Sequence, residues 1–239
     1  MQLGDNKILA IKSDFRVIIS PSTLCIPDNI MKAIDAIWQQ AVEQPGSKLF
    51  DGKILCASAV DSTALSCAVM PYRFFYAQRQ SNLIREALQI QIVAVSGVIL
   101  HDQLLYFGRR SLSNTQYPGF IELVPSGSID ADLVVANGIA DFRQQLTEEL
   151  KEELGINCSS VSSIDPLFLI FDHQEQTWDI CCQITLLPNV AIGAGNGRRS
   201  DEYEEIFSVP LSASANFVKD NSNHLVLTTQ AILQQLFPQ

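Results

Sequence analysis

Residues 148–156, with the sequence EELKEELGI, constrain this chain more than any other segment. Side chains three and four positions apart share one face of a helix, so we expect Glu149, Glu152 and Glu153 to project together. The apolar positions face the other way, into a core: Leu150, Leu154 and Ile156. Like charges at this spacing repel each other. The segment predicts a helix that ends at a glycine and carries either a solvated acidic face or a metal site.

The order of residues in this segment resembles the second half of the Nudix box, whose pattern is Gly-x5-Glu-x7-Arg-Glu-hydrophobic-x-Glu-Glu-x-Gly-hydrophobic. The positions that match are Glu149, Leu150, Glu152, Glu153, Gly155 and Ile156. Three positions do not match, because the arginine falls on Glu148, the earlier glutamate on Ala140 and the leading glycine on Val134. The resemblance implies an enzyme that hydrolyses diphosphate bonds.

The glycine that fits best is Gly127, in the sequence ELVPSGS of residues 122–128. This stretch looks like the strand and turn that open the Nudix box. Between Gly127 and Glu149 the chain holds about seven residues more than the family pattern, and a longer loop is a mild cost because closure entropy grows only with the logarithm of length. We place the extra residues within 130–138.

A predicted hairpin precedes this turn and ends at two arginines. Residues 90–100 and 104–107 are β-branched and apolar, and a short polar turn separates them. Arg109 and Arg110 follow at once. A guanidinium can donate two parallel hydrogen bonds to a phosphate, and in Nudix enzymes the equivalent stretch lies beside the diphosphate. The alternative is a pair of exposed arginines at a strand end.

The front of the chain has a pattern of its own. It predicts strands at 15–20, 53–60 and 63–69 and a helix over 28–43 with an apolar stripe. The stretches AIW at 36–38, LFDGK at 49–53 and Tyr72-Arg73-x-Phe75 are similar to the Nudix branch that hydrolyses UDP-glucose and UDP-galactose. That branch also has a degenerate box. The resemblance implies substrate contacts from Tyr72, Arg73, Phe75, Arg109, Arg110 and Gly127, whereas a plain core is the alternative for the aromatic rings.

Towards the C-terminus, strands are predicted at 166–172 and 178–186 and a helix over 227–237. Glu202, Glu204 and Glu205 precede a further apolar run and are either a base or ligand over the site or a solvated loop. The expected fold is an α/β/α Nudix sandwich with a central mixed sheet, preceded by a small N-terminal α+β domain. We expect the division at residues 1–88 and 89–239.

The resemblance also implies a cofactor and a reaction. Mg²⁺, or Mn²⁺ in its place, would be held by Glu149 and Glu153, with Glu152 as a third ligand or as the base. Glu149, Glu152 and Glu153 are thus the expected catalytic residues, and a UDP-sugar would yield UMP and a sugar 1-phosphate. Two alternatives stay open: a pyrophosphatase for ADP-ribose or another nucleoside diphosphate conjugate, and an inactive Nudix-fold nucleotide-binding or regulatory module.

Charge and composition limit the kinds of partner and the cellular compartment that we expect for this protein. A net charge of −10 argues against binding nucleic acid through its phosphates. No apolar run is long enough for a membrane span, and residues 1–6 lack the basic start of a signal peptide. The six cysteines show no Cys-x-x-Cys pair, which is typical of buried thiols in a reducing compartment. We expect a cytoplasmic protein whose partner is a small nucleotide-sugar, and the sequence leaves monomer and homodimer open.

Overall fold

The computed structural model describes residues 7–21, 25–135, 137–192 and 202–237. Its helices are α1 (Asp28–Val42), α2 (Tyr72–Gln80), α3 (Asn82–Leu88), α4 (Phe142–Leu154), α5 (Ser214–Asp220) and α6 (Leu227–Leu236). Its strands are β1 (Lys7–Ala10), β2 (Arg16–Ile19), β3 (Lys53–Val60), β4 (Ala64–Pro71), β5 (Ile92–His101), β6 (Leu104–Arg110), β7 (Ile121–Leu123), β8 (Ser126–Ser128), β9 (Val134–Val135), β10 (Ile139–Ala140), β11 (Val161–Asp172), β12 (Thr177–Leu186) and β13 (Tyr203–Pro210). No helix in the described part of the chain has the length and apolar character that crossing a bilayer needs.

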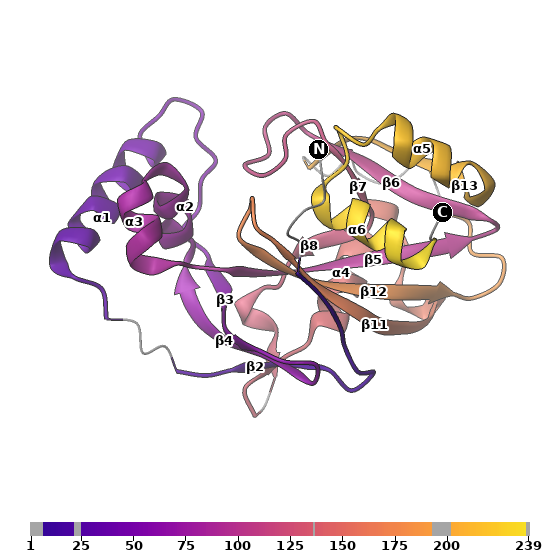
Figure 1. Ribbon diagram of the computed structural model, residues 1–239, viewed down its shortest axis with the longest axis horizontal. Coiled ribbons are helices and arrows are strands. Elements are labelled where there is room, and N and C mark those ends of the chain that lie inside the picture. The colour runs from indigo at the N-terminus through magenta and orange to yellow at the C-terminus, as the bar shows by residue number, and fades with distance from the viewer. Residues whose placement is uncertain (1–6, 22–24, 136, 193–201, 238–239) are drawn as a thin grey trace.

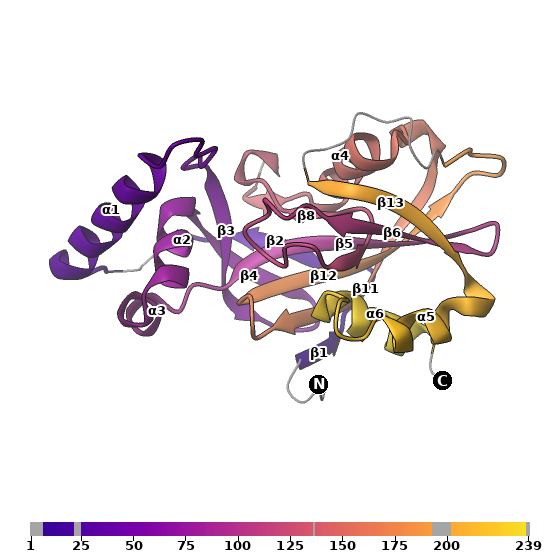
Figure 2. The same ribbon diagram turned by 90° about the horizontal axis from the view of Figure 1, so that it is seen from above.

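The strands form a mixed sheet, which confirms the expected fold class. Its main path runs β1-β11-β12-β5-β3-β4-β2-β10-β9, while β6 joins β13, β7 and the far end of β5. The pairs β12–β5 and β2–β4 are parallel, and their neighbours are antiparallel. In Figure 2 the strands lie between α4 on one side and α5 with α6 on the other. The result is a three-layer arrangement around the sheet.

The central strand β5 explains why the layers pack as they do. Its residues are buried almost without interruption from Ile92 to Ile99, as expected of a strand covered on both faces. On one face, Val93 and Val95 pack in a core with Leu146, Leu150 and Leu154 of α4. On the other face, Val98 belongs to a second core that includes Ile232 and Leu233 of α6. The sheet and α4 are therefore fixed against each other by apolar packing.

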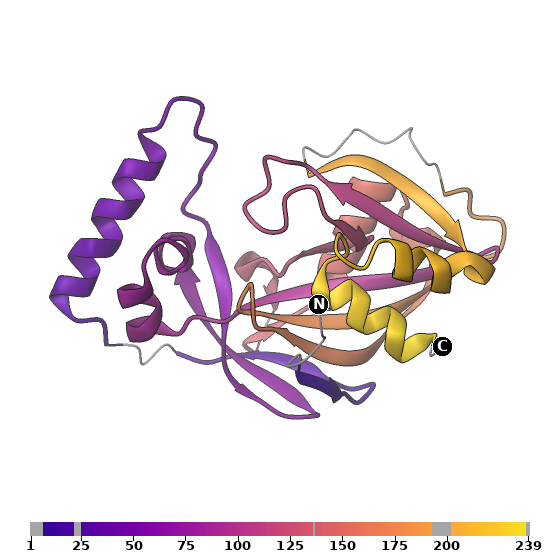
Figure 3. The same ribbon diagram turned by 45° about the horizontal axis from the view of Figure 1, so that its top comes forward.

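Helices α1, α2 and α3 form a separate layer at one end of the molecule (Figures 1 and 3). The helix predicted over 28–43 is confirmed as α1, one residue shorter, and Ile30 and Ile34 are buried against the two following helices. The sequence pattern predicts no helix just after residue 71, whereas the structure has α2 over Tyr72–Gln80, directly after Pro71 ends β4. Trp38 of α1 packs edge-on against Tyr72 and Tyr76 of α2. The aromatic run is therefore part of a helix–helix contact.

Strands from the front and rear of the chain share hydrogen bonds. Residues 7–10 of β1 pair antiparallel with residues 168–171 of β11, and β2 pairs with β10. Cys56 of β3 pairs with Ile92 of β5. The boundary at residue 88 stays a prediction, and the sheet runs across it. Of the cysteines, Cys56, Cys67, Cys181 and Cys182 are buried as expected, but Cys25 and Cys158 are exposed.

Candidate active site

Helix α4 presents the acidic residues, and both of its ends are set by local chemistry. At the start, the Asp141 carboxylate accepts hydrogen bonds from the backbone N–H groups of Arg143 and Gln144, each at 3.1 Å. This is the usual way to satisfy the free amides of a first turn. At the end, Gly155 has a φ of +68°, and the N–H of Ile156 returns to the carbonyl of Leu150 at 3.1 Å. The helix stop predicted at the glycine is confirmed.

The glutamates of α4 do not share one environment. Glu153 is buried, with 5% of its surface exposed. Glu149 is half-buried, whereas Glu148 and Glu152 are exposed. The structure therefore brings Glu149 and Glu153 together on the side of the helix that faces the sheet, and Glu152 lies at the solvent side of the pair. In the described residues no group of three or more His, Cys, Asp or Glu side chains is arranged as a metal site.

Glu149 lies directly against the turn that Gly127 makes in β8. A β-carbon on Gly127 would overlap the Glu149 carboxylate, so any larger residue at position 127 would displace that side chain. The same carboxylate accepts a hydrogen bond from Gln145 Nε2 at 2.8 Å, and Gln145 Oε1 accepts one from the N–H of Asp130 at 2.9 Å. Glu149 is thus held from two sides, by Gly127 of β8 and by Gln145 of its own helix.

Burial makes both inner carboxylates hard to ionise. It raises the pKa of Glu149 to about 7, helped by the charges of Glu202, Glu152 and Glu148 and opposed by the hydrogen bond from Gln145. Burial raises the pKa of Glu153 well above its ordinary value, with Glu149, Glu122 and Glu202 adding to the shift and the Ser126 backbone opposing it. Neither oxygen of Glu153 has a hydrogen-bond partner of ordinary geometry.

Such an arrangement can hold a cation. An unpaired buried carboxylate is costly in free energy, and a divalent ion placed between Glu149 and Glu153 would remove the desolvation cost and the mutual repulsion together. Oxygen donors of this kind suit Mg²⁺ and Mn²⁺. The two unpartnered oxygens of Glu153 are the observation that fits a metal here.

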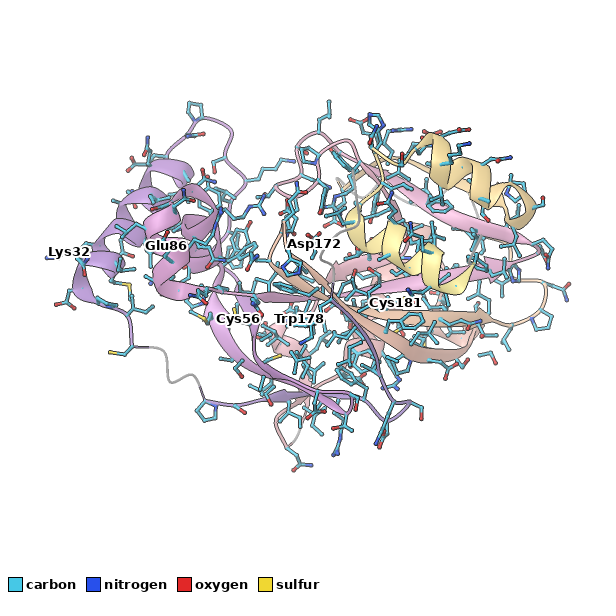
Figure 4. All side chains as sticks on the ribbon, viewed as in Figure 1. Lys32, Cys56, Glu86, Asp172, Trp178 and Cys181 are labelled. Carbon is cyan, nitrogen blue, oxygen red and sulfur yellow. The ribbon has the colours of Figure 1, made fainter. Side chains whose placement is uncertain are left out.

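A cavity of about 120 Å³ is lined by Gly127, the residue that contacts Glu149, but neither Glu149 nor Glu153 is among the described residues that line it. Residues that matter for its chemistry line it from several elements: Arg110, Glu122, Gly127, Asp172, Asp179 and Glu202. Figure 4 shows Asp172 where β11 ends toward the helical layer. Asp172 accepts hydrogen bonds from Tyr117 Oη at 2.5 Å and from the N–H of Gln174 at 2.8 Å. Among the charged residues that line the cavity in the described part of the chain, carboxylates outnumber the single guanidinium of Arg110.

Arg110 is the arginine of the predicted basic pair that reaches this cavity. It forms an ion pair with the buried carboxylate of Glu122, and its Nε donates to the carbonyl of Gln116 at 3.1 Å. Tyr203 Oη donates to the same Glu122 at 2.7 Å. Arg109 lies outside, half-exposed, with Glu205 at 3.9 Å. Of the three glutamates considered as a base, Glu202 lines the cavity, and Glu204 and Glu205 are exposed.

The front residues predicted to contact substrate lie apart from this wall. Phe75 is buried in the helical layer with 1% of its surface exposed. Arg73 pairs with Asp51 at 3.0 Å and Asp35 at 3.7 Å. Tyr72 packs against Trp38. None of these three side chains is among the described residues that line the cavity.

A different front residue, Arg79, reaches the site. It forms an ion pair with Glu175, which lines the cavity, and its Nη2 donates to the carbonyl of Thr115 at 3.1 Å. Sequence reasoning missed Arg79, and it also missed Gln145 and Asp179. The one available signal was a charged residue, Asp179, within the apolar run of residues 178–182, all of which are buried in β12.

Comparisons with known proteins find only distant structural similarity. No family model matches the chain, and no curated protein matches it. Among solved structures, a Nudix hydrolase from Nitrosomonas europaea is similar at 12% identity with a TM-score of 0.39, over 81% of this chain and 92% of that one. The MutT protein from Methanosarcina mazei Go1 gives 17% identity and a TM-score of 0.42, over 62% and 96% of the two chains.

A longer protein is also similar in part. A bifunctional NMN adenylyltransferase/ADP ribose pyrophosphatase from Francisella tularensis gives 13% identity and a TM-score of 0.48, over 69% of this chain and 45% of that one. At identities and TM-scores this low, the function has to be inferred from the site itself.

Proposed function

We propose that this protein is a Nudix-type hydrolase that cleaves the diphosphate bond of a nucleoside diphosphate sugar, with UDP-glucose and UDP-galactose as the leading substrates. One observation carries the proposal. Glu153 is a buried carboxylate without partners, one turn from Glu149, which lies against Gly127. Glu149 and Glu153 are two of the positions that match the Nudix box, and Gly127 belongs to the stretch that looks like its opening strand and turn.

The side chains of α4 would hold the metal. Glu149 and Glu153 would be ligands of Mg²⁺ or Mn²⁺, and Glu152, exposed beside them, would be a third ligand or hold the attacking water as a base. When bound, the ion would polarise a phosphorus centre and neutralise charge on the leaving phosphate. Gln145 fixes the Glu149 carboxylate, a role that outer hydrogen bonds commonly have at metal sites.

Other residues would bind the diphosphate. Gly127 lets the backbone of β8 approach the site, because any side chain there would collide with Glu149. Arg110 brings a guanidinium to the cavity, although Glu122 takes up part of its hydrogen bonding. The box arginine is replaced by Glu148, whose side chain accepts from Gln144 at 3.0 Å, and exposed Lys151 is the nearest cation on the helix.

The choice of a UDP-sugar rests on the resemblance of the front segments. Since Tyr72, Arg73 and Phe75 do not line the cavity in the described residues, their proposed contribution is to shape the helical layer from which Arg79 reaches the site. A second candidate function, nucleotide binding without turnover, is favoured by Glu148 at the arginine position. ADP-ribose is the other substrate class to be tested.

The test is a metal-dependent hydrolysis assay. The protein is incubated with Mg²⁺ or Mn²⁺ and UDP-glucose, UDP-galactose, ADP-ribose or NADH, and release of nucleoside monophosphate is measured. We expect turnover of the UDP-sugars and a loss of about a hundredfold or more in Glu153→Gln. Glu148→Gln, on the exposed side of the same helix, is the matched control and should keep activity.

Each outcome has a clear meaning. Turnover of ADP-ribose without the UDP-sugars would replace the substrate and keep the reaction. Tight binding without turnover of any compound would establish the binding module instead of the enzyme. Undiminished turnover by Glu153→Gln would remove the proposed metal ligand from the mechanism.

A further inference from the structure

Asp179 is a buried carboxylate in the cavity wall that does not belong to the proposed metal pair. It lies on β12 where that strand runs parallel to β5, with Ala94 as its register partner. Its side chain has 4% of its surface exposed. Ser96 Oγ donates to Oδ2 at 2.7 Å. The Thr228 hydroxyl lies close enough to oppose the effect of burial on the pKa of this carboxyl, but Oδ1 has no hydrogen-bond partner of ordinary geometry. One face of this carboxylate is satisfied by the protein and the other is not.

The neighbouring acidic groups of the cavity are already engaged. Asp172 accepts from the Tyr117 hydroxyl and from two backbone N–H groups. Glu122 is paired with Arg110 and accepts from the Tyr203 hydroxyl. Glu175 is paired with Arg79. Among these cavity-lining carboxylates of the described residues, Asp179 is the one with a fully buried oxygen that lacks a hydrogen-bond partner.

The chemistry of that oxygen limits what can complete it. A phosphate oxygen is a negatively charged acceptor and would be repelled by a carboxylate. An N–H or O–H group is a donor and would recover the hydrogen bond that burial has cost. The matching parts of a nucleoside diphosphate conjugate are therefore its base and its sugar hydroxyls.

We propose that Asp179 determines specificity at this site by accepting, through Oδ1, a hydrogen bond from an N–H or O–H of the non-phosphate part of a bound nucleoside diphosphate conjugate. The inference rests on the proposed function, which supplies the class of ligand. It assigns opposite ends of the ligand to different carboxylates. Glu149 and Glu153 act at the diphosphate, and Asp179 contacts the base or sugar that distinguishes one conjugate from another.

The test uses Asp179→Asn, which keeps the shape of the side chain and an oxygen for Ser96. The amide replaces one acceptor by a donor, so the ligand donor would meet another N–H. With UDP-glucose and ADP-ribose as substrates, we expect KM to rise at least tenfold for the substrate that is turned over, while kcat stays within about threefold. A site built to bind a donor discriminates strongly when the pairing is broken.

Two further variants make the result interpretable. Asp165→Asn removes an exposed carboxylate on β11 that accepts only from Ser163 among the described hydrogen bonds, and it should leave KM unchanged. Asp179→Ser also removes the carboxylate acceptor and has a smaller side chain. If Asp179→Asn fails to fold, the KM of Asp179→Ser is measured in its place. A melting temperature for each variant distinguishes lost binding from lost structure.

Binding without metal separates the two sources of the donor. UDP and ADP are titrated into the protein in EDTA by calorimetry. If Asp179→Asn weakens UDP or ADP binding at least fivefold, the donor belongs to the nucleoside. If only the intact sugar conjugate is affected, the donor is a hydroxyl of the terminal sugar.

The proposal and the proposed function fail in different ways. Wild-type protein that turns over none of the conjugates would overturn the function, and the EDTA titrations would still decide the role of Asp179. A KM within twofold of wild type in both Asp179 variants would overturn the inference while leaving the enzyme in place. Wild-type protein that binds none of UDP, ADP or the conjugates would overturn the inference as well.

Discussion

Gly127 and Glu149 occupy adjoining space, so that the carboxylate of one excludes a side chain on the other. The two residues are far apart in sequence and come from a strand and a helix. Their contact joins the opening turn of the site to the helix that carries the acidic pair. It also gives a direct way to disturb Glu149 without changing its chemistry.

Gly127→Ala should lower kcat by about tenfold or more, because the new methyl group displaces the Glu149 carboxylate and small displacements of positioned groups are costly. Turnover of the substrate and circular dichroism are measured together. Gly52→Ala is the matched control, since the nearest atoms there belong to the exposed side chain of Phe50. Equal activity in the two variants would show that the contact does not position Glu149.

Addition of about 10 mM Mg²⁺ should raise the melting temperature of the wild-type protein by about 2–4 °C, since a ligand that binds only the folded state stabilises it. Glu153→Gln should lose this increase, because an amide offers no charge to the ion. Differential scanning fluorimetry with and without EDTA provides the measurement. An increase of the same size in Glu153→Gln would place the ion elsewhere.

Asp179 should make stability depend on pH. Burial, opposed by hydrogen bonds from Ser96 and Thr228, raises its pKa to about 6. The folded protein then holds a proton that the unfolded chain releases near pH 4, so this carboxyl destabilises the fold increasingly as pH rises from about 4 to 6. The difference in free energy of unfolding between Asp179→Asn and wild type should therefore grow, in favour of the variant, by on the order of 2 to 3 kcal/mol over that range. Above pH 6 the difference should level off.

The measurement for Asp179 is urea unfolding of both proteins at several pH values. Asp165→Asn, at an exposed position, supplies the control and should run parallel to wild type. A constant difference between wild type and Asp179→Asn from pH 4 to 7 would contradict the assigned pKa shift.

Arg110 and Arg109 should differ sharply although they are adjacent in sequence. Arg110→Ala leaves the buried carboxylate of Glu122 without its cation, and removal of one partner of such a pair costs about 3 kcal/mol or more. Arg109→Ala breaks a contact of 3.9 Å between half-exposed and exposed groups, which should cost less than about 1 kcal/mol. Thermal unfolding of both variants checks this contrast. Equal losses would mean that burial does not govern the pair.

Local patterns predicted much of the fold. The apolar spacing of α1, the β-branched runs of β3 and β5 and the glycine at the end of α4 each act over a few residues, so their elements were found within about two positions. The helix over Tyr72–Gln80 was harder to predict from the sequence, because the aromatic side chains in this segment have modest helix propensity. Helix α2 is stabilised by packing of Tyr72 and Tyr76 against Trp38, a contact that no local pattern contains.

The candidate site likewise combines residues that local sequence patterns predict with residues that they do not. Spacing on α4 was enough to select Glu149, Glu152 and Glu153, but the rotation of the helix against the sheet decides that Glu153 is buried and Glu152 is not. Arg79 reaches Glu175 across a long stretch of chain, and Asp179 meets Ser96 across two strands. Pairings of this kind depend on the completed sheet, so sequence spacing could not reveal them.

The place of β1 at the outer edge of the sheet has a consequence for how the molecule is made. Residues 7–10 pair with residues 168–171, so β1 stays without this partner until synthesis of the chain has reached β11. During that time its backbone groups are unpaired and open to association with other chains. Contacts between such distant residues also slow folding. The yield of folded protein should therefore depend on how quickly β11 is synthesised after β1 and pairs with it.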